Sequence, residues 1–211
     1  MEVELVAITP DAEKVIENAG RTCYLSFDRA SPDSHKRFIR MLIKNGHHTV
    51  LEHAVATFRI KGVSRAMTHQ LVRHRIASFS QQSQRYVSEK NFHYVVPESI
   101  KKNPEAEKIF MEVIEKSREV YRKLQEMGIK NEDARFVLPN AVCSEIVVTA
   151  NLREWRHIIG LRGSKYAQWE IRKMASEILK ILKIHAPTVF EDFEVDENDV
   201  IVSLKNNTSS T

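Results

Sequence analysis

Residues 73–86, RHRIASFSQQSQRY, bring cationic side chains next to a run of hydroxyl and amide side chains. Arginine carries a planar fork of N–H donors that matches phosphate oxygens, and serine and glutamine add neutral hydrogen-bonding groups. If residues 80–86 are extended, Gln81, Ser83 and Arg85 lie on one side of the chain. The pattern therefore predicts a binding site for a phosphate or a nucleotide. The alternative is a solvated face that forms salt bridges, which is the usual state of a short basic triplet.

The segment before this stretch is expected to be a helix. Residues 64–74 carry Met67 and Leu71 one turn apart, as an amphipathic helix does. Gln70 and Arg73 are three residues apart, so their side chains would share a face of that helix. An amide donor beside a guanidinium strengthens the prediction of an anion site.

The elements that must position these residues alternate between strands and helices. Strands are expected where β-forming residues are bounded by turn residues, at 1–8, 54–61 and 92–96. Helices are expected after Thr9-Pro10-Asp11 and at 34–44, 104–127, 131–138 and 164–185. Residues 143–149 are a buried strand or a buried helix, and periodicity leaves both open. The alternation predicts one compact, helix-rich α/β or α+β domain over residues 1–211.

Apolar spacing predicts which helix positions are buried, namely Phe38, Met41 and Leu42 in the second helix and Ile109, Val113 and Leu124 in the long one. Asn151 and Glu154 have the spacing of a capping box that opens a further helix.

Glycines at 160 and 163 are expected to interrupt the helix that starts at Asn151. Such a break would aim Arg162 away from both helical faces and free it from packing. Arg65, at the start of its own helix, is expected to be a solvated surface charge.

The composition limits the class of protein. The net charge of +4, from 32 basic and 28 acidic residues, permits an anionic ligand without requiring a nucleic acid. No stretch reaches the roughly 20 apolar residues of a membrane span, and the first residues lack the pattern of a signal peptide. Two distant cysteines, Cys23 and Cys143, are expected to be reduced thiols of a cytoplasmic protein. The polar tail from about residue 205 is expected to be flexible.

The spacing of Arg73, His74, Arg75 and Ser83 resembles the RHR-x7-S motif of flavin-dependent thymidylate synthases. Two flanking segments support the resemblance. GHHTVLEH at residues 46–53 is similar to that family's GHxTxxEH segment, and residues 151–171 are similar to its N-x-R…LR…AQWE segment. The resemblance extends from about residue 40 to residue 186.

The resemblance implies a compact α/β protomer with a central, mostly antiparallel sheet, assembled as a homotetramer whose active sites are shared between subunits. It implies the conversion of dUMP to dTMP. In that reaction 5,10-methylenetetrahydrofolate supplies the carbon, FAD carries the hydride and NADPH reduces the flavin. No metal, nucleic-acid or membrane partner is expected. The wide dispersal of the motif residues along the chain also favours a homo-oligomer.

The same resemblance assigns residues. It implies FAD contacts for His47, Thr49, Arg73, His74, Arg75, Gln81, Asn151, Arg153 and His157. It implies dUMP contacts for Gln70, Arg73, Gln81, Gln82, Ser83, Gln84 and Arg85, with Arg135 reaching the phosphate from another subunit. Arg162 is the residue to which the resemblance gives a catalytic role. It would bind the uracil ring and stabilise its N3-ionised form.

The chain departs from the family pattern at two places. Ser80-Gln81 stands where the motif often has Asn-Glu, and Tyr166 stands where a later His is usual. Gln81 can still donate and accept hydrogen bonds, but an acid/base role there loses support.

Two other classes of protein compete with this interpretation. A metal hydrolase would use some of the nine histidines, but the chain has neither an HExxH nor an HxxEH segment. A nucleic-acid-binding module would use the basic helix at 65–75, but acidic residues occur throughout and no binding fingerprint is present. Cys143 lies in an apolar stretch and is expected to be a buried structural thiol.

Overall fold

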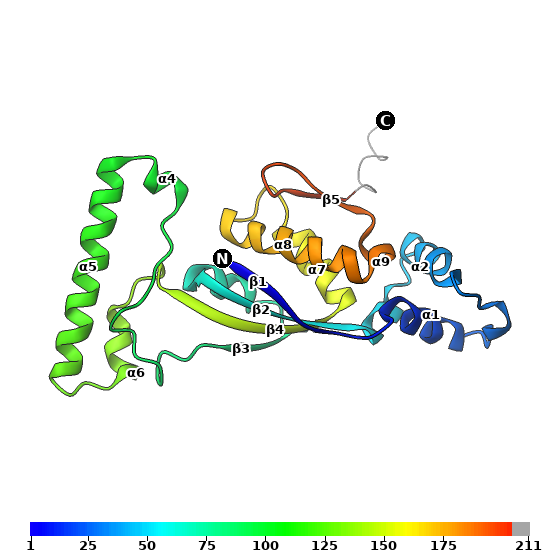
Figure 1. Ribbon diagram of the computed structural model, residues 1–211, viewed down its shortest axis with the longest axis horizontal. Coiled ribbons are helices and arrows are strands. Elements are labelled where there is room, and N and C mark those ends of the chain that lie inside the picture. Colours follow the sequence, from blue (N-terminus) through cyan, green and yellow to red (C-terminus); the bar gives the residue numbers. More distant parts are fainter. Residues whose placement is uncertain (204–211) are drawn as a thin grey trace. The chain divides into compact units, whose positions relative to one another are not determined.

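The computed structural model describes residues 1–203 (Figure 1). The tail predicted to be flexible lies outside the described residues. The chain divides into two compact units. The first unit comprises residues 1–2, 60–71 and 80–146, and the second comprises residues 3–59, 72–79 and 147 onward. The expectation of a single domain stays a prediction.

Four strands form one sheet in the spatial order β1 (Glu2–Ile8), β2 (Val55–Ser64), β4 (Cys143–Asn151) and β3 (Ser78–Gln81). The backbone N–H groups of Thr9 and Leu152 donate to the carbonyls of Val55 and Ala54, each over 2.9 Å. The ends of β1 and β4 therefore both lie beside the start of β2, and both strands run antiparallel to it. The predicted antiparallel sheet is confirmed.

Strand β4 resolves the choice between strand and helix at residues 143–149. Ser144, Ile146, Val148 and Ala150 are buried and the residues between them are partly exposed. This period of two belongs to a strand with one face in the core.

The second unit packs its helices around β-strand residues of the same unit. Its elements are α1 (Ala12–Thr22), η1 (Phe27–Arg29), α2 (Ser34–Lys44), η2 (His48–His53), α7 (Leu152–Arg162), α8 (Trp169–His185), α9 (Pro187–Phe190) and the hairpin β5 (Phe193–Val195) and β6 (Ile201–Ser203). Helices α7 and α8 lie side by side (Figure 1). Trp155 is fully buried, donates to the Ala56 carbonyl over 3.0 Å and meets Phe58 edge-on.

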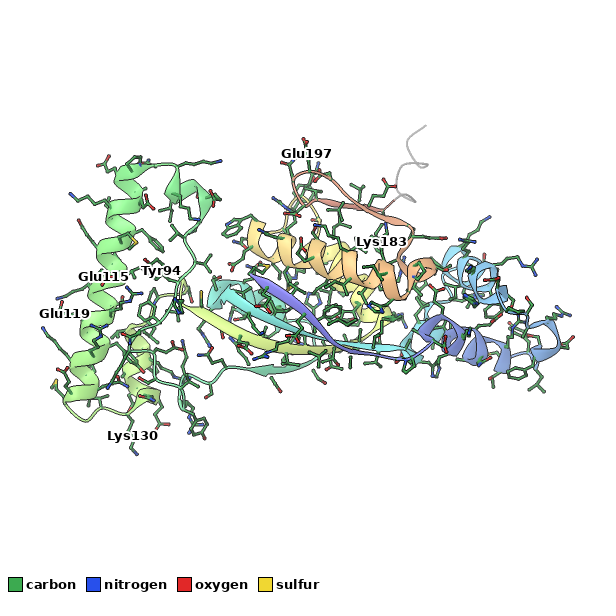
Figure 2. The ribbon with its side chains drawn as sticks, in the orientation of Figure 1. Tyr94, Glu115, Glu119, Lys130, Lys183 and Glu197 are labelled. Carbon is green, nitrogen blue, oxygen red and sulfur yellow. The ribbon has the colours of Figure 1, made fainter. Side chains whose placement is uncertain are left out.

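The first unit is built on a long helix. Its elements beyond the sheet are α3 (Arg65–Leu71), α4 (Glu98–Lys101), α5 (Pro104–Glu126), α6 (Asn131–Ala134) and η3 (Arg135–Val137). Its core joins Phe92, Ile114 and Val142, and Tyr94 packs against them beside α5 (Figure 2). The predicted strand at 92–96 is wrong, since only Tyr94 forms an isolated bridge, to Val142.

Several predicted core positions are wrong. Ile109 and Val113 on α5 are 57% and 54% exposed, and the buried residues of that helix are Ile114 and Tyr121. The reason is that α5 packs on one face only, while its apolar spacing covers a second face as well. On α2, Leu42 is buried as expected, but Ile39 and Ile43 accompany it instead of Phe38 and Met41.

The predicted break at Gly160 does not occur. Helix α7 is continuous from Leu152 to Arg162 and ends at Gly163, so Arg162 occupies its last turn. A Cβ added at Gly163 would lie 2.4 Å from Cδ1 of Ile201, and the Ile201 N–H donates to the Gly163 carbonyl over 2.8 Å. Glycine at 163 therefore serves this close approach. No helix within residues 1–203 is long and apolar enough to cross a membrane.

Candidate functional site

The Arg73-His74-Arg75 segment follows α3 and places its side chains in different environments. The side chain of His74 is 3% exposed, whereas Arg73 and Arg75 are exposed. Helix α3 ends at Leu71, so Arg73 lies beyond it. The prediction that Gln70 and Arg73 share a helical face is therefore wrong.

His74 connects two residues of α7. The Nε of Arg162 donates to Nε2 of His74 over 2.9 Å, and Nδ1 of His74 lies 3.3 Å from Oε1 of Glu154. Because arginine only donates, Nε2 must be the acceptor, and the neutral ring then carries its proton on Nδ1. That proton is donated to Glu154. The result is a chain of hydrogen bonds from Arg162 through His74 to Glu154.

Burial and neighbouring charges keep the imidazole of His74 neutral. Burial, with the charges of Arg162 and His157, lowers the pKa of His74 to about 4. Burial likewise lowers the pKa of Arg162, with Arg73 as the second cause. Burial raises the pKa of Glu154, against the opposing effects of His157 and Arg153. Arg162, Arg153 and Arg73 thus bring positive charge near the buried pair of His74 and Glu154, and exposed positive charge of this kind suits an anionic ligand.

The same residues could be considered as a metal site. Ligand atoms of His74, Glu154 and His157 lie within 4.8 Å of one another. However, the Arg162 guanidinium already donates to His74 Nε2, and a cation there would face this charge. The arrangement favours an anion, and the expectation of no metal stays a prediction.

A cavity of about 590 Å³ lies in the second unit, beside the hydrogen-bonded residues Arg162, His74 and Glu154. It is lined by His48, Glu52, Ile76, Asn151, Arg153, Glu154, Arg156, His157 and Phe193. The structure thus brings together Asn151, Arg153 and His157, three of the residues assigned to the cofactor.

Two of these residues already have partners within the chain. Asn151 Oδ1 accepts from the Glu154 N–H over 2.8 Å, which is the predicted N-cap, so its side-chain amide group is what remains for a ligand. Arg153 pairs with Glu52 over 2.6 Å.

Residues that sequence reasoning missed also line the cavity. His47 and Thr49 are exposed and do not line it, whereas His48 and Glu52 do. The short helix η2 puts this second pair, four residues apart, on the cavity side. Arg156 was missed as well. It is held by two hydrogen bonds to Asp192, of 2.6 and 2.7 Å.

In the first unit, Gln81 is the last residue of β3, and its side-chain amide donates hydrogen bonds to other side chains of the protein. Its Nε2 donates to Thr68 Oγ1 over 2.9 Å and to Ser144 Oγ over 3.0 Å. Both N–H groups are therefore directed at the protein, and the side chain presents its carbonyl oxygen as an acceptor. This arrangement fits a supporting role better than proton transfer.

The prediction that residues 80–86 are extended is wrong beyond Gln81. The Tyr86 N–H donates to the Ser83 carbonyl over 3.2 Å, which closes a turn, and Ser83 Oγ accepts from the Arg85 N–H over 3.3 Å. Arg85 pairs with Glu132 over 3.2 Å at the surface. Gln82 donates to Glu89 over 3.3 Å.

Arg135 lines a second cavity, of about 320 Å³, together with Arg65, Gln84, Phe136, Leu138, Pro139 and Asn140. Burial and the charge of Arg135 lower the pKa of Arg65, which is half-buried. The prediction that Arg65 is a solvated surface charge is therefore wrong. Two guanidiniums beside the Gln84 amide form a second site suited to an anion.

Cys143 is half-buried and not fully buried, and both cysteines are free thiols. It lines a third cavity, of about 550 Å³, with Gln82, His93 and Ser144 among its neighbours. Its backbone N–H donates to the His93 carbonyl over 2.8 Å. The fold thus brings His93, fifty positions away in the sequence, to the lining of the same cavity.

Comparisons with known proteins point to a single group of relatives. A family model described as "Thymidylate synthase complementing protein" matches residues 4–188. The flavin-dependent thymidylate synthase of Geobacter sulfurreducens is 45% identical over 200 residues, covering 91% of this chain and 86% of that protein. The one of Corynebacterium glutamicum is 42% identical, covering 92% and 85%. The solved structure of a flavin-dependent thymidylate synthase from Helicobacter pylori, complexed with FAD and dUMP, matches with a TM-score of 0.77 at 28% identity, over 91% of this chain and 99% of that chain.

Proposed function

Because the chain belongs to the flavin-dependent thymidylate synthase family, we propose that it methylates dUMP to dTMP, with 5,10-methylenetetrahydrofolate as carbon donor and NADPH as reductant. The observation that carries the proposal is the contact of Arg162 with buried, neutral His74, beside a cavity lined by Arg153 and His157. FAD and dUMP are the ligands named for the related Helicobacter pylori structure. A cytoplasmic location stays a prediction.

The donor set of the second unit fits FAD. Arg153, His48 and His157 line one cavity with the Asn151 side chain, and such groups suit the oxygens of a pyrophosphate. Ile76 and Phe193 add apolar surface to the same cavity, as ring systems require. Bound FAD would supply hydride transfer, while the protein binds and orients. The roles of His47, Thr49, Arg73, Arg75 and Gln81 toward FAD belong to the same proposal.

Arg162 carries the catalytic part of the proposal. Its guanidinium lies at the end of α7 with Nε committed to His74, and burial lowers its pKa. Held against the uracil ring, this charge favours the N3-ionised form and moves electron density to C5, the carbon to be methylated. The protein then needs no thiol nucleophile, in agreement with a Cys143 that has no role in the Arg162 site.

Residues of the first unit bind the rest of the nucleotide in this proposal. Arg135 is assigned to the phosphate, and the cavity that it shares with Arg65 and Gln84 supports this assignment. Gln70, Gln82, Ser83 and Arg85 are assigned to the nucleotide as well. Gln81, anchored by Thr68 and Ser144, offers a fixed acceptor.

We further propose that the enzyme is a homotetramer with shared sites. Ile109, Val113 and Phe136 are exposed by 57%, 54% and 83% in the protomer, so α5 and the segment after it present apolar surface. Exposed apolar surface of this kind is typical of protein–protein interfaces. The assigned residues are also widely dispersed along the chain, from His47 to Arg162, which favours a site completed by another subunit.

The proposal is tested with the purified protein and dUMP tritiated at C5. We expect a flavin absorbance spectrum, and tritium release that depends on FAD, NADPH and methylenetetrahydrofolate. A flavin-loaded protein that releases no tritium would disprove the proposed reaction. Copurified nucleic acid or zinc without flavin would support one of the competing classes instead.

A further inference from the structure

The predicted capping box at the start of α7 is only half formed. In a complete box the side chain of the third helical residue bonds back to the N–H of the capping residue. Asn151 does cap the helix through the Glu154 N–H over 2.8 Å. The Glu154 carboxylate, however, lies 3.3 Å from Nδ1 of His74, eighty residues away in the sequence. Its side chain is 8% exposed, so this carboxylate is buried for a contact that helix capping does not explain.

We propose that Glu154 is a positioning residue for Arg162 and that it acts through His74. By accepting the Nδ1 proton, Glu154 selects the tautomer in which Nε2 carries a lone pair. That lone pair accepts the Nε–H of Arg162 over 2.9 Å and fixes the plane of the guanidinium. The inference rests on the proposed function, in which Arg162 holds the uracil ring.

The alternative tautomer shows why Glu154 matters. With the proton on Nε2, an N–H of His74 would face the N–H of Arg162, and two donors repel each other. A doubly protonated His74 would be worse, because it would place a second cation beside Arg162 at the same distance. In either state the guanidinium would have to move, and a displacement of about 1 Å can cost a hundredfold in rate.

Glu154 is buried together with His74, and the exposed side chains of Arg153 and His157 act on it electrostatically. A glutamine would keep the accepting oxygen and lose only the charge. Glu154→Gln removes the charge alone, whereas Glu154→Ala removes both the charge and the hydrogen-bond acceptor. Comparison of the two variants therefore separates the effect of the hydrogen bond from that of the charge.

The matched control is Glu105→Ala. Glu105 lies in the first turn of α5, two residues after the capping residue Asn103. Like Glu154 in α7, it is thus an acidic residue in the first turn of a helix that an asparagine caps. It is exposed and has no place in the proposed site. A general effect of removing an acid from the first turn of a helix would appear in both alanine variants.

The tautomer of His74 is measured directly by nitrogen-15 NMR of the imidazole in the full chain, with His74→Gln used to assign the signal. We expect a proton on Nδ1 in the wild type and in Glu154→Gln, and loss of that state in Glu154→Ala. A wild-type protein with the proton on Nε2 would overturn the inference. This measurement needs no turnover, so it tests Glu154 even if the proposed reaction fails.

Steady-state kinetics give the second readout, in flavin-loaded protein whose folding is checked by circular dichroism. We expect Glu154→Ala to lower kcat for dUMP by about 10- to 100-fold, the range known for residues that orient metal ligands from a second layer. Glu154→Gln should keep most of the turnover and Glu105→Ala all of it. Equal losses in both Glu154 variants, or wild-type turnover in Glu154→Ala, would show that the carboxylate does not position Arg162.

Discussion

Replacing Arg162 with alanine should remove most of the turnover and leave the fold intact. The guanidinium lies at the end of α7, partly buried, with one N–H committed to His74 over 2.9 Å. Preorganised charge of this kind is worth roughly 3–4 kcal/mol in the transition state, or about a hundred- to a thousand-fold in rate. The cost to stability is smaller, since loss of the hydrogen bond to His74 leaves the Nε2 acceptor unpaired, at about 1–3 kcal/mol.

The assay is the steady-state methylation of dUMP together with dUMP affinity, at equal flavin content. Arg65→Ala is a poor control because Arg65 is half-buried beside Arg135. Arg37→Ala is the better one, since Arg37 is exposed on α2 of the same unit as Arg162. Arg162→Lys should recover little activity, because a point charge does not reproduce the planar fork. Near-normal turnover in folded, flavin-loaded Arg162→Ala would refute the role given to this residue.

Three further predictions concern other parts of the molecule. Cys143→Ser and Cys23→Ser should retain turnover, because the proposed reaction uses no thiol; abolished activity in folded Cys143→Ser would indicate covalent thiol chemistry. Mixing inactive Arg135→Ala with inactive Arg162→Ala should restore part of the activity if subunits exchange, and a fully active monomer by light scattering would contradict shared sites. Between pH 6.5 and 4 unfolded His74 binds a proton that folded His74 does not, so the free energy of unfolding should fall by about 3 kcal/mol as the pH drops through that window. Urea titrations should show a flatter pH dependence in His74→Gln, and an unchanged slope would mean that His74 is already protonated in the fold.

Helices were predicted well where the spacing of apolar residues fitted a helix and not a strand. The long helix at 104–127, the helix at 34–44 and the cap at Asn151 follow from sequence spacing and are confirmed. Residues 143–149 were ambiguous because a central strand and a buried helix are equally apolar, and only pairing with β2 decides between them. Gly160 was misjudged because one glycine costs a helix only about 1 kcal/mol, which the packing of α7 overcomes.

The site was harder to predict because its contacts join residues far apart in the chain. The motif indicated Arg73, His74 and Arg75 as a unit, but the fold buries the histidine alone. His48 and Arg156 were missed because their place beside the cavity depends on η2 and on Asp192, neither of which a motif displays. The exposure of Ile109 and Val113 depends on what packs against α5, which helical periodicity does not reveal.

The chain that follows residue 188 has a consequence for anyone trimming this protein. The family segment stops there, but Phe193 lines the 590 Å³ cavity and Asp192 holds Arg156. Lys183, which is labelled in Figure 2, donates to the Phe193 carbonyl over 2.5 Å. A boundary drawn by homology would remove Phe193 from the cavity lining and Asp192 from Arg156, while leaving every motif residue in place. An expression fragment that preserves these tertiary contacts must therefore include the β5–β6 hairpin.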